Sequence, residues 1–312
     1  MRYHVGLAHD DAPSHPRQET SVKPSPARFA ATTAAFAALL CAAAVQAQAL
    51  PDTLGKIKAA GEINVAYSPD SIPFSAQGAD GKPAGYSIDL CNKVIAAIGR
   101  SVGNPNLKVN WTPGTVSERL AAVSAGRADL ECANTSATLS RMQHVDFSNL
   151  SFVDAGGFLV RADGPIQSLA DMMGKKIAVI GGTTTEQRLH ATLKDRKVQA
   201  GVVAVRDANE GAQLLETRQV DAFAGDKIKL IGIAVTAKDP ALFSLLVADF
   251  SIEPYAFALP RGDSALRLVV NRELTRVYVS GEIEEIFARW LGKLGRPSGM
   301  LAAMYVLNAV PD

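Results

Sequence analysis

Hydrophobic and polar residues from Leu50 onward alternate with two periods, one typical of strands and one typical of helices. Short apolar runs such as EINVAY predict buried strands. An apolar stripe predicts a helix, as Ile88, Val94 and Ile98 do, with Gly99 behind them. The first unit is therefore predicted to contain helix 53–60 closed by Gly61, strand 62–67, helix 87–98, strand 107–111, helix 116–124 and strand 129–132.

The same alternation continues in a second unit. Strands that alternate with helices of about ten residues indicate an α/β fold with a mainly parallel sheet. Two further amphipathic helices, 264–280 and 282–291, are expected to return to the first unit, and the tail 296–312 is expected to pack on the surface. The second unit is predicted to contain strand 157–161, helix 168–173, strand 175–180, helix 184–193, strand 201–205, helix 208–217 and strand 220–224.

The stretch from Asp129 to Ser148 combines a buried strand, a small polar turn and a helix start. The turn contains Asn134 and Ser136, Thr138 is the expected N-cap, and Arg141 falls in the first turn of the helix. A cation is poorly placed there because the helix dipole favours anions at that end. Arg141, beside hydroxyls and free N–H groups, is therefore predicted to hold a carboxylate.

A similar design follows strand 175–180. Gly181 and Gly182 allow close approach of the backbone to a ligand, and Thr183 with Glu186 has the spacing of a capping box. Two helix N-termini at the carboxyl ends of strands predict two sides of an anion-binding cleft. Asp226, just past strand 220–224, is expected at the same edge.

Length and composition limit the class of protein. The 312 residues suffice for two domains, and 47% hydrophobic with 20% charged residues is ordinary for a globular protein. The formal net charge of +1 argues against nucleic acid or an anionic membrane surface as the partner.

Residues 1–49 have the features of a secretory signal peptide behind an N-terminal extension. Lys23 and Arg28 precede the uncharged run 29–45, which ends near Ala47-Gln48-Ala49, so cleavage is expected after Ala49. The run is too short for a membrane anchor to be favoured. Leu40 argues against lipidation of Cys41, and translation starting at Val22 is a further reading.

Little in the remaining chain suggests metal or cofactor chemistry. It keeps His144, His190, Cys91 and Cys132, too few ligands for an ordinary zinc site, and no P-loop or catalytic serine or zinc motif occurs. We therefore predict no metal and no cofactor. In an exported protein the cysteines either form a disulfide or remain two buried thiols, and both readings stay open.

Several motifs carry a family resemblance from about Leu54 to Gly292. The chain resembles the solute-binding proteins of polar amino-acid ABC importers, family 3 type, and among them the glutamate/aspartate-binding branch. The resemblance implies a type II periplasmic-binding-protein fold with two α/β lobes, 50–152 with 255–312 and 156–251, joined by a two-strand hinge at 153–155 and 252–254. Its motifs read LGKIKAAGEINVAY, IPFSAQGADGKPAGYSIDL, AGRADLECANTSATLSRMQHVDFS, SLADMMGKKIAVIGGTTTEQ and QVDAFAGD.

The resemblance also implies a binding site for one amino acid in the periplasm, in a monomer that delivers it to an ABC permease in the inner membrane. It implies that Arg141 binds the α-carboxylate and Asp226 the α-ammonium group. Asn134 and Ser136 are implied to add hydrogen bonds from lobe 1, and Thr183 and Thr184 from lobe 2.

The side-chain end of the site departs from the branch. Relatives carry aromatic residues near Ser71 and Val116, a basic residue near Ser68 and a histidine near Ala208. Of the groups that bind a distal carboxylate, Arg119 alone is kept. Ser71 is expected to line the cleft, and Arg119 either reads an acidic ligand or forms an ordinary ion pair.

The same fold also occurs in periplasmic enzymes of the cyclohexadienyl dehydratase type. Such an enzyme needs a general acid with a shifted pKa in the cleft. Glu131 in the binding stretch is the acid considered for this role, and it is expected to face away or to pair structurally. A receptor's sensing domain is disfavoured because no membrane segment follows the second unit.

Overall fold

A computed structural model of the chain describes residues 52–246 and 248–311. These residues belong to one compact unit. The predicted signal peptide and its cleavage site lie outside the described residues. Among the helices of the described part, none has both the length and the hydropathy needed to cross a membrane.

The N-terminal elements follow the predicted order closely. Helix α2, strand β1 and helix α4 begin and end where the sequence predicts, and β1 lies between two parallel partners, β5 and β6. A small sheet of β2, β3 and β4, which the pattern does not predict, inserts after β1. These elements are α2 (Thr53–Ala60), β1 (Glu62–Tyr67), β2 (Asp70–Ser71), β3 (Ser75–Gln77), β4 (Pro83–Ala84), α3 (Tyr86–Val102), β5 (Lys108–Pro113), α4 (Val116–Ser124) and β6 (Leu130–Cys132).

Helix α3 is longer than predicted. It continues past Gly99 to Val102 and ends at Gly103, whose φ of 75° is the left-handed conformation of a helix end. Gly99 lies inside the helix for a packing reason, because a Cβ there would come 2.8 Å from the carbonyl oxygen of Asn104. The apolar stripe ends at Val102, which is buried.

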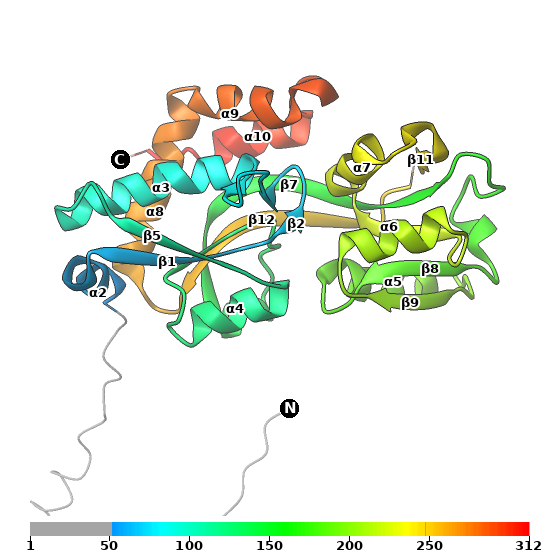
Figure 1. Cartoon of the computed structure of the whole chain (residues 1–312), viewed down its shortest axis with the longest axis horizontal. Helices are drawn as coiled ribbons and strands as arrows, with labels where there is room; N and C mark the ends of the chain where they lie inside the picture. Colours follow the sequence, from blue (N-terminus) through cyan, green and yellow to red (C-terminus); the bar gives the residue numbers. More distant parts are fainter. Residues whose placement is uncertain (1–51, 247, 312) are drawn as a thin grey trace, which may run out of the picture. The chain divides into compact units, whose positions relative to one another are not determined.

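Strands β7 (Val145–Arg161) and β12 (Ser251–Pro260) run side by side as long antiparallel partners (Figure 1). The sequence predicts only residues 157–161 of β7. The first part of β7 was missed because polar residues such as Asn149 and Asp154 break the apolar pattern. Those polar residues are half-buried or buried and are hydrogen-bonded to neighbouring elements.

The elements between β7 and β12 form a second α/β group. The connected sheet has the order β5-β1-β6-β12-β7-β10-β8-β9, with β11 paired to β7. Asp226 is the last residue of β10, so the strand ends two residues later than predicted. The elements of this group are η2 (Ala170–Met172), β8 (Lys176–Ile180), α5 (Thr184–Asp195), β9 (Gly201–Val205), α6 (Ala208–Glu216), β10 (Ala222–Asp226), α7 (Lys227–Thr236), η3 (Pro240–Leu242) and β11 (Phe243–Leu245).

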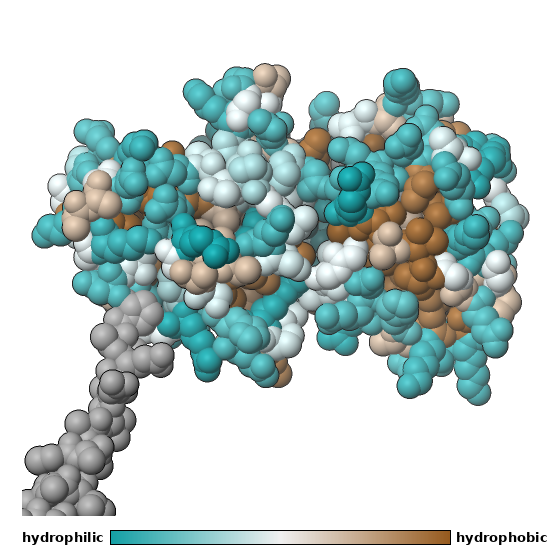
Figure 2. Space-filling model, turned by 60° about the horizontal axis from the view of Figure 1, so that its bottom comes forward, coloured by the Kyte–Doolittle hydropathy of each residue, from teal (hydrophilic) through white to brown (hydrophobic). Residues whose placement is uncertain are grey.

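The buried cores divide in the same way. Two hydrophobic clusters are built from α2 to β7 together with β12 and the C-terminal helices, and we call this part lobe 1. Two others are built from the end of β7 to β11, and we call this part lobe 2. Hydrophilic residues cover most of the face in Figure 2, with hydrophobic residues gathered mainly toward its right side.

The C-terminal helices return to lobe 1, as predicted. They are α8 (Ser264–Val279), α9 (Glu282–Leu291) and α10 (Gly299–Asn308). The tail, which was expected to pack on the surface, forms α10 and packs more deeply than expected, because Leu301, Met304 and Tyr305 belong to the core of lobe 1. The Tyr305 and Tyr86 hydroxyls lie 3.0 Å apart. Leu307 of the same helix is exposed.

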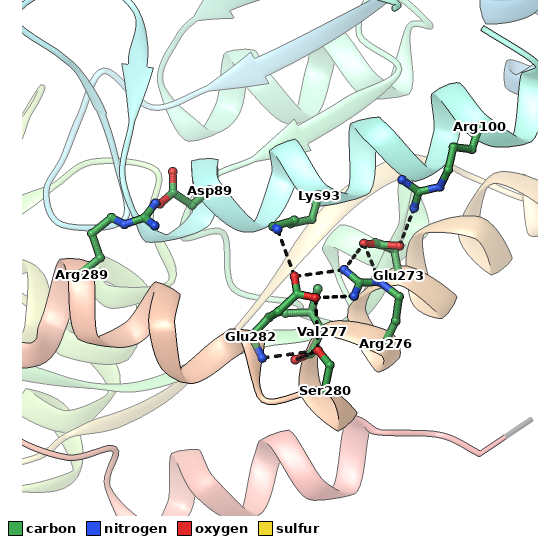
Figure 3. Close-up of polar contacts among 9 residues, drawn as sticks. All are labelled: Asp89, Lys93, Arg100, Glu273, Arg276, Val277, Ser280, Glu282 and Arg289. Carbon is green, nitrogen blue, oxygen red and sulfur yellow. Dashed lines mark hydrogen bonds and ion pairs between the residues drawn. The ribbon is translucent and has the colours of Figure 1, made fainter. Parts of the chain in front are cut away.

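Ion pairs and a disulfide fasten α3 to its neighbours. Figure 3 shows Glu282 between Lys93 of α3 and Arg276 of α8, while Glu273 accepts from Arg100 and Arg276. These contacts hold α3 against α8 and α9. The question left open by the cysteines is settled, because Cys91 of α3 and Cys132 of β6 are joined by a disulfide.

Candidate functional site

A cavity of about 360 Å³ lies between residues of lobe 1 and lobe 2. Its volume falls in the range of small-molecule sites. The strand ends and helix N-termini that the sequence singled out meet here. All eight residues predicted to bind a ligand line this cavity: Ser71, Arg119, Asn134, Ser136, Arg141, Thr183, Thr184 and Asp226.

Arg141 reaches the cavity from a short turn. The predicted helix is a single 3₁₀ turn, Arg141–Gln143, because Gln143 is soon followed by β7. Thr138 still fixes its start, since the Thr138 hydroxyl accepts from the Arg141 N–H at 3.2 Å. The guanidinium donates from Nη1 to the Ser136 carbonyl at 2.7 Å. Burial lowers the pKa of Arg141, but this group starts so far above neutrality that it stays charged.

The N-terminus of α5 supplies the facing donors. The Thr183 hydroxyl accepts from the Glu186 N–H at 3.1 Å, as a capping residue does. The reciprocal half of the predicted capping box differs, because the Glu186 carboxylate accepts from Gly182 instead of Thr183. The first backbone N–H groups of α5 therefore remain oriented toward the cavity end of the helix.

The Asp226 carboxylate is oriented by hydrogen bonds from three neutral side chains. It stands at the N-cap position of α7 but makes no side-chain capping bond. Instead it accepts from the Thr185 hydroxyl at 2.8 Å, from the Tyr255 hydroxyl at 2.6 Å and from the Asn134 amide at 3.3 Å. These partners are neutral, so the buried charge has no cationic partner among them.

Glu253 on β12 was missed by the sequence reasoning. It is 1% exposed and accepts from the hydroxyls of Ser136 at 2.5 Å, Thr184 at 2.7 Å and Ser251 at 2.7 Å. It thereby orients one predicted ligand-binding residue from each lobe. The stretch SIEPYA was interpreted only as a connection, and nothing in its pattern indicated that Glu253 points inward.

Arg119 forms a buried ion pair. Its Nε donates to Glu131 Oε1 at 2.7 Å, and its other nitrogens donate to the Gly114 carbonyl at 2.7 Å and the Thr135 hydroxyl at 3.2 Å. Arg119 is 5% exposed and Glu131 is fully buried. The expectation that Glu131 pairs structurally is confirmed. Its second oxygen, Oε2, has no hydrogen-bond partner among the described residues.

Ser68, Asp70 and Ser71 add further polar groups to the cavity wall. The Ser71 and Ser68 hydroxyls are 2.8 Å apart, and Ser68 donates to Asp70 at 3.0 Å. Asp70 also accepts from the Ala208 N–H at the start of α6, at 3.1 Å. Burial raises the pKa of Asp70, but the charge of Lys229 and these hydrogen bonds outweigh it, so the pKa lies below the ordinary value.

A second acid lies behind Asp226 on the connecting strands. Asp154 of β7 accepts from the backbone N–H groups of Ala155 and Ile228 and, at 3.4 Å, from the Tyr255 hydroxyl. Burial, and then the charge of Asp226, raise the pKa of Asp154 to about 7. Tyr255 thus bridges two carboxyl groups where the lobes join.

A family model of the bacterial extracellular solute-binding proteins, family 3, matches residues 63–293. The chain belongs to this family. An L-glutamate/L-aspartate-binding protein of Pseudomonas aeruginosa is 35% identical over 270 residues, covering 86% of this chain and 89% of the relative. A glutamate/aspartate import solute-binding protein of Escherichia coli K12 is 30% identical over 262 residues, covering 83% and 87%.

The solved structures agree with the fold. That of an ancestral amino acid-binding protein, AncCDT-1, a precursor of cyclohexadienyl dehydratase, has a TM-score of 0.65 and 27% identity, covering 77% of this chain and 99% of the other. The chain thus has the two-lobed α/β fold of the amino-acid-binding proteins of ABC importers, with β7 and β12 as the strands that connect its lobes.

Proposed function

We propose that the protein is the extracytoplasmic binding component of an ABC importer. It captures one L-amino acid between its lobes and delivers it to a membrane permease. The observation that carries this proposal is the position of two charges: Arg141 of lobe 1 and Asp226 of lobe 2 line the same cavity. A guanidinium and a carboxylate across one small cavity match the two charges of a zwitterion.

The two charges assign the ends of the ligand. Arg141, with the Ser136 backbone and the N-terminus of α5 at Thr183 and Thr184, receives the α-carboxylate. Asp226, already oriented by Asn134, receives the α-ammonium group. An acceptor-only carboxylate suits an ammonium donor, and a guanidinium suits a planar carboxylate.

Closure of the lobes completes the site. Only a closed arrangement offers the contacts of both lobes at once, so the ligand stabilises that arrangement. We place the lobes at 50–152 with 255–312 and at 156–251, and the hinge at 153–155 and 252–254. In support, β7 and β12 pair at Val153 with Pro254 and at Ala155 with Ile252, directly between the separate cores.

The names of the relatives favour an acidic amino acid. Two of them are named for glutamate and aspartate, and we take these as the first candidates for this chain. We further propose that the protein works as a periplasmic monomer after cleavage behind Ala49. The mass of the exported polypeptide tests the cleavage site. The mass of the native particle in solution tests the monomeric state.

Binding is favoured over catalysis. Glu131, the acid considered for an enzyme, is held in the ion pair with Arg119. Among the acids that line the cavity, the pKa values of Asp70 and Glu118 lie below their ordinary values, which suits ionised structural groups. A general acid instead needs a pKa raised toward the working pH.

Calorimetry on stripped protein tests the proposal. The mature chain is unfolded, dialysed and refolded to remove ligand, then titrated with glutamate, aspartate, glutamine and arginine, beside a chromatographic assay for product. We expect saturable binding without turnover. Arg141→Ala should abolish binding of every α-amino acid, whereas Arg272→Ala, an exposed arginine on α8, should not. Equal binding by wild type and Arg141→Ala would refute the assignment.

A further inference from the structure

Helix α7 begins with two lysines, Lys227 and Lys229, and has no acidic residue in its first turn. This placement opposes the helix dipole, which favours anions at an N-terminus. Lys227 is compensated, because its ammonium donates to Asp249 at 2.8 Å. Lys229 lines the cavity and makes no ion pair or side-chain hydrogen bond with any residue of 52–246 or 248–311.

The other cations along the cavity wall are already engaged. Arg119 is paired with Glu131 at 2.7 Å, and Arg206 is paired with Glu210 at 3.1 Å. Arg141 donates to the Ser136 carbonyl and is assigned to the α-carboxylate. Within the described part of the chain, Lys229 is therefore the cation of this wall whose N–H groups have no acceptor.

The position of Lys229 suits the distal end of a ligand. Asp226 and Lys229 are the N-cap and the third helical residue of α7, a spacing at which side chains are neighbours on one face. An amino acid whose α-ammonium group rests on Asp226 can extend a short side chain toward Lys229.

We propose that Lys229 binds the side-chain carboxylate of the ligand and so sets the preference for acidic amino acids. This inference rests on the proposed function, because Asp226 must hold the ammonium group. It gives α7 a cation for the side-chain end of the ligand, where this chain has Ser68 and Ala208 in place of the basic groups of the branch. Arg119, bound to Glu131, then acts as a positioning residue that orients the cavity wall.

The Asp70 carboxylate is already hydrogen-bonded to Ser68 and to the Ala208 N–H. The charge of Lys229 helps to keep Asp70 ionised.

The test compares matched acid and amide ligands. Stripped wild type, Lys229→Met and the control Lys227→Met are each titrated calorimetrically with glutamate, glutamine, aspartate and asparagine. Loss of a charged hydrogen bond predicts that Lys229→Met binds both acids about tenfold to one hundredfold more weakly. Its affinity for the amides should change by less than about threefold. Lys227→Met should bind like wild type, and Lys229→Arg should keep the acid preference.

The outcomes separate the two proposals. If wild type binds none of the α-amino acids, the proposed function fails. If wild type binds them but Lys229→Met keeps the wild-type ratio of acid to amide affinity, the role of Lys229 is refuted and the proposed function stands. A wild-type preference for the amides over the acids would also refute the role of Lys229. Melting of each variant by circular dichroism shows that lost affinity does not come from unfolding.

Discussion

At the scale of single residues, two buried carboxylates hold side chains of the cavity wall in place. Glu131 and Glu253 are almost wholly inaccessible, and each is surrounded by donors from residues that line the cavity. Burial of a charge is costly unless partners compensate it. Each carboxylate therefore holds its donors in one arrangement, which prepares the cavity wall before a ligand arrives.

The pair Arg119–Glu131 gives a stability prediction. Arg119→Met removes the cation and leaves Glu131 charged in the core, so the free energy of unfolding should fall by about 3–5 kcal/mol. The double variant Arg119→Met with Glu131→Gln should recover most of this loss. Urea unfolding followed by tryptophan fluorescence measures both. A single variant as stable as wild type would show that the pair contributes little.

Asp154 gives a pH prediction. Its pKa is about 7 in the folded protein against an ordinary value of 3.8, so between these values the folded state binds a proton that the unfolded state lacks. Stability therefore rises as pH falls from 7 toward 4, by up to about 4 kcal/mol from this group, and above pH 7 the cost of the buried charge is fully present.

Asp154→Asn removes that titration. The stability of wild type relative to Asp154→Asn should decrease between pH 5 and pH 8, as measured by urea midpoints at constant ionic strength. Asp226, Tyr255 and the N–H groups of Ala155 and Ile228 surround this carboxyl group and are unchanged in the variant. A pH-independent difference would contradict the shifted pKa.

At the scale of elements, helix α3 is fastened to three neighbouring elements of lobe 1. It is joined to β6 by the Cys91–Cys132 disulfide, to α9 through Lys93 and Glu282, and to α8 through Arg100 and Glu273 (Figure 3). Exposed ion pairs contribute little singly, but a shared network limits how the helices can slide. The strand β6, which leads into Asn134 and Ser136, is thereby held in place.

The disulfide closes a loop of 41 residues in sequence. In the chain-entropy model, opening such a loop lowers stability by about 4 kcal/mol. Cys91→Ala with Cys132→Ala should show this loss in urea unfolding, and dithiothreitol should affect wild type but not the double variant. Affinity for the amino acid, measured at a temperature where both proteins are folded, should change little, because neither cysteine lines the cavity. A double variant as stable as wild type would argue against the Cys91–Cys132 disulfide.

At the scale of the whole molecule, function depends on two cores that are connected by two strands. Hydrogen bonds from the Ala208 N–H to Asp70, from Asn134 to Asp226 and from Tyr255 to Asp226 cross between the lobes. These bonds do not depend on a ligand. A zwitterion that bridges Arg141 and Asp226 adds charged contacts that the open arrangement lacks.

Small-angle scattering of stripped protein tests this closure. Saturation with the tightest-binding amino acid should reduce the radius of gyration, and the same concentration should leave Arg141→Ala unchanged. The physical reason is that the ligand shifts the equilibrium only through its contacts with both lobes. A wild-type radius that stays constant despite calorimetric binding would exclude a closing motion as the consequence of capture.

The sequence by itself determined many of the helices and strands, and it predicted residues that line the cavity. Periodicity located α2, β1 and α4 because their apolar stripes and caps are local features. The small polar turn beside Arg141 predicted that this residue holds a carboxylate, although the helix on which the dipole argument relied is only a 3₁₀ turn. Features that depend on residues close in sequence, such as helix caps and apolar stripes, can be recognised from the sequence.

The tertiary structure decided what depends on contacts between distant segments. It extended β7 through polar residues, placed Glu253 between Ser136 and Thr184, engaged Arg119 with Glu131 and left Lys229 facing the cavity. None of these pairings follows from spacing along the chain. The charged side chains that can bind a ligand are those left unpaired once the buried ion pairs have formed. Which side chains these are is decided only in the folded protein.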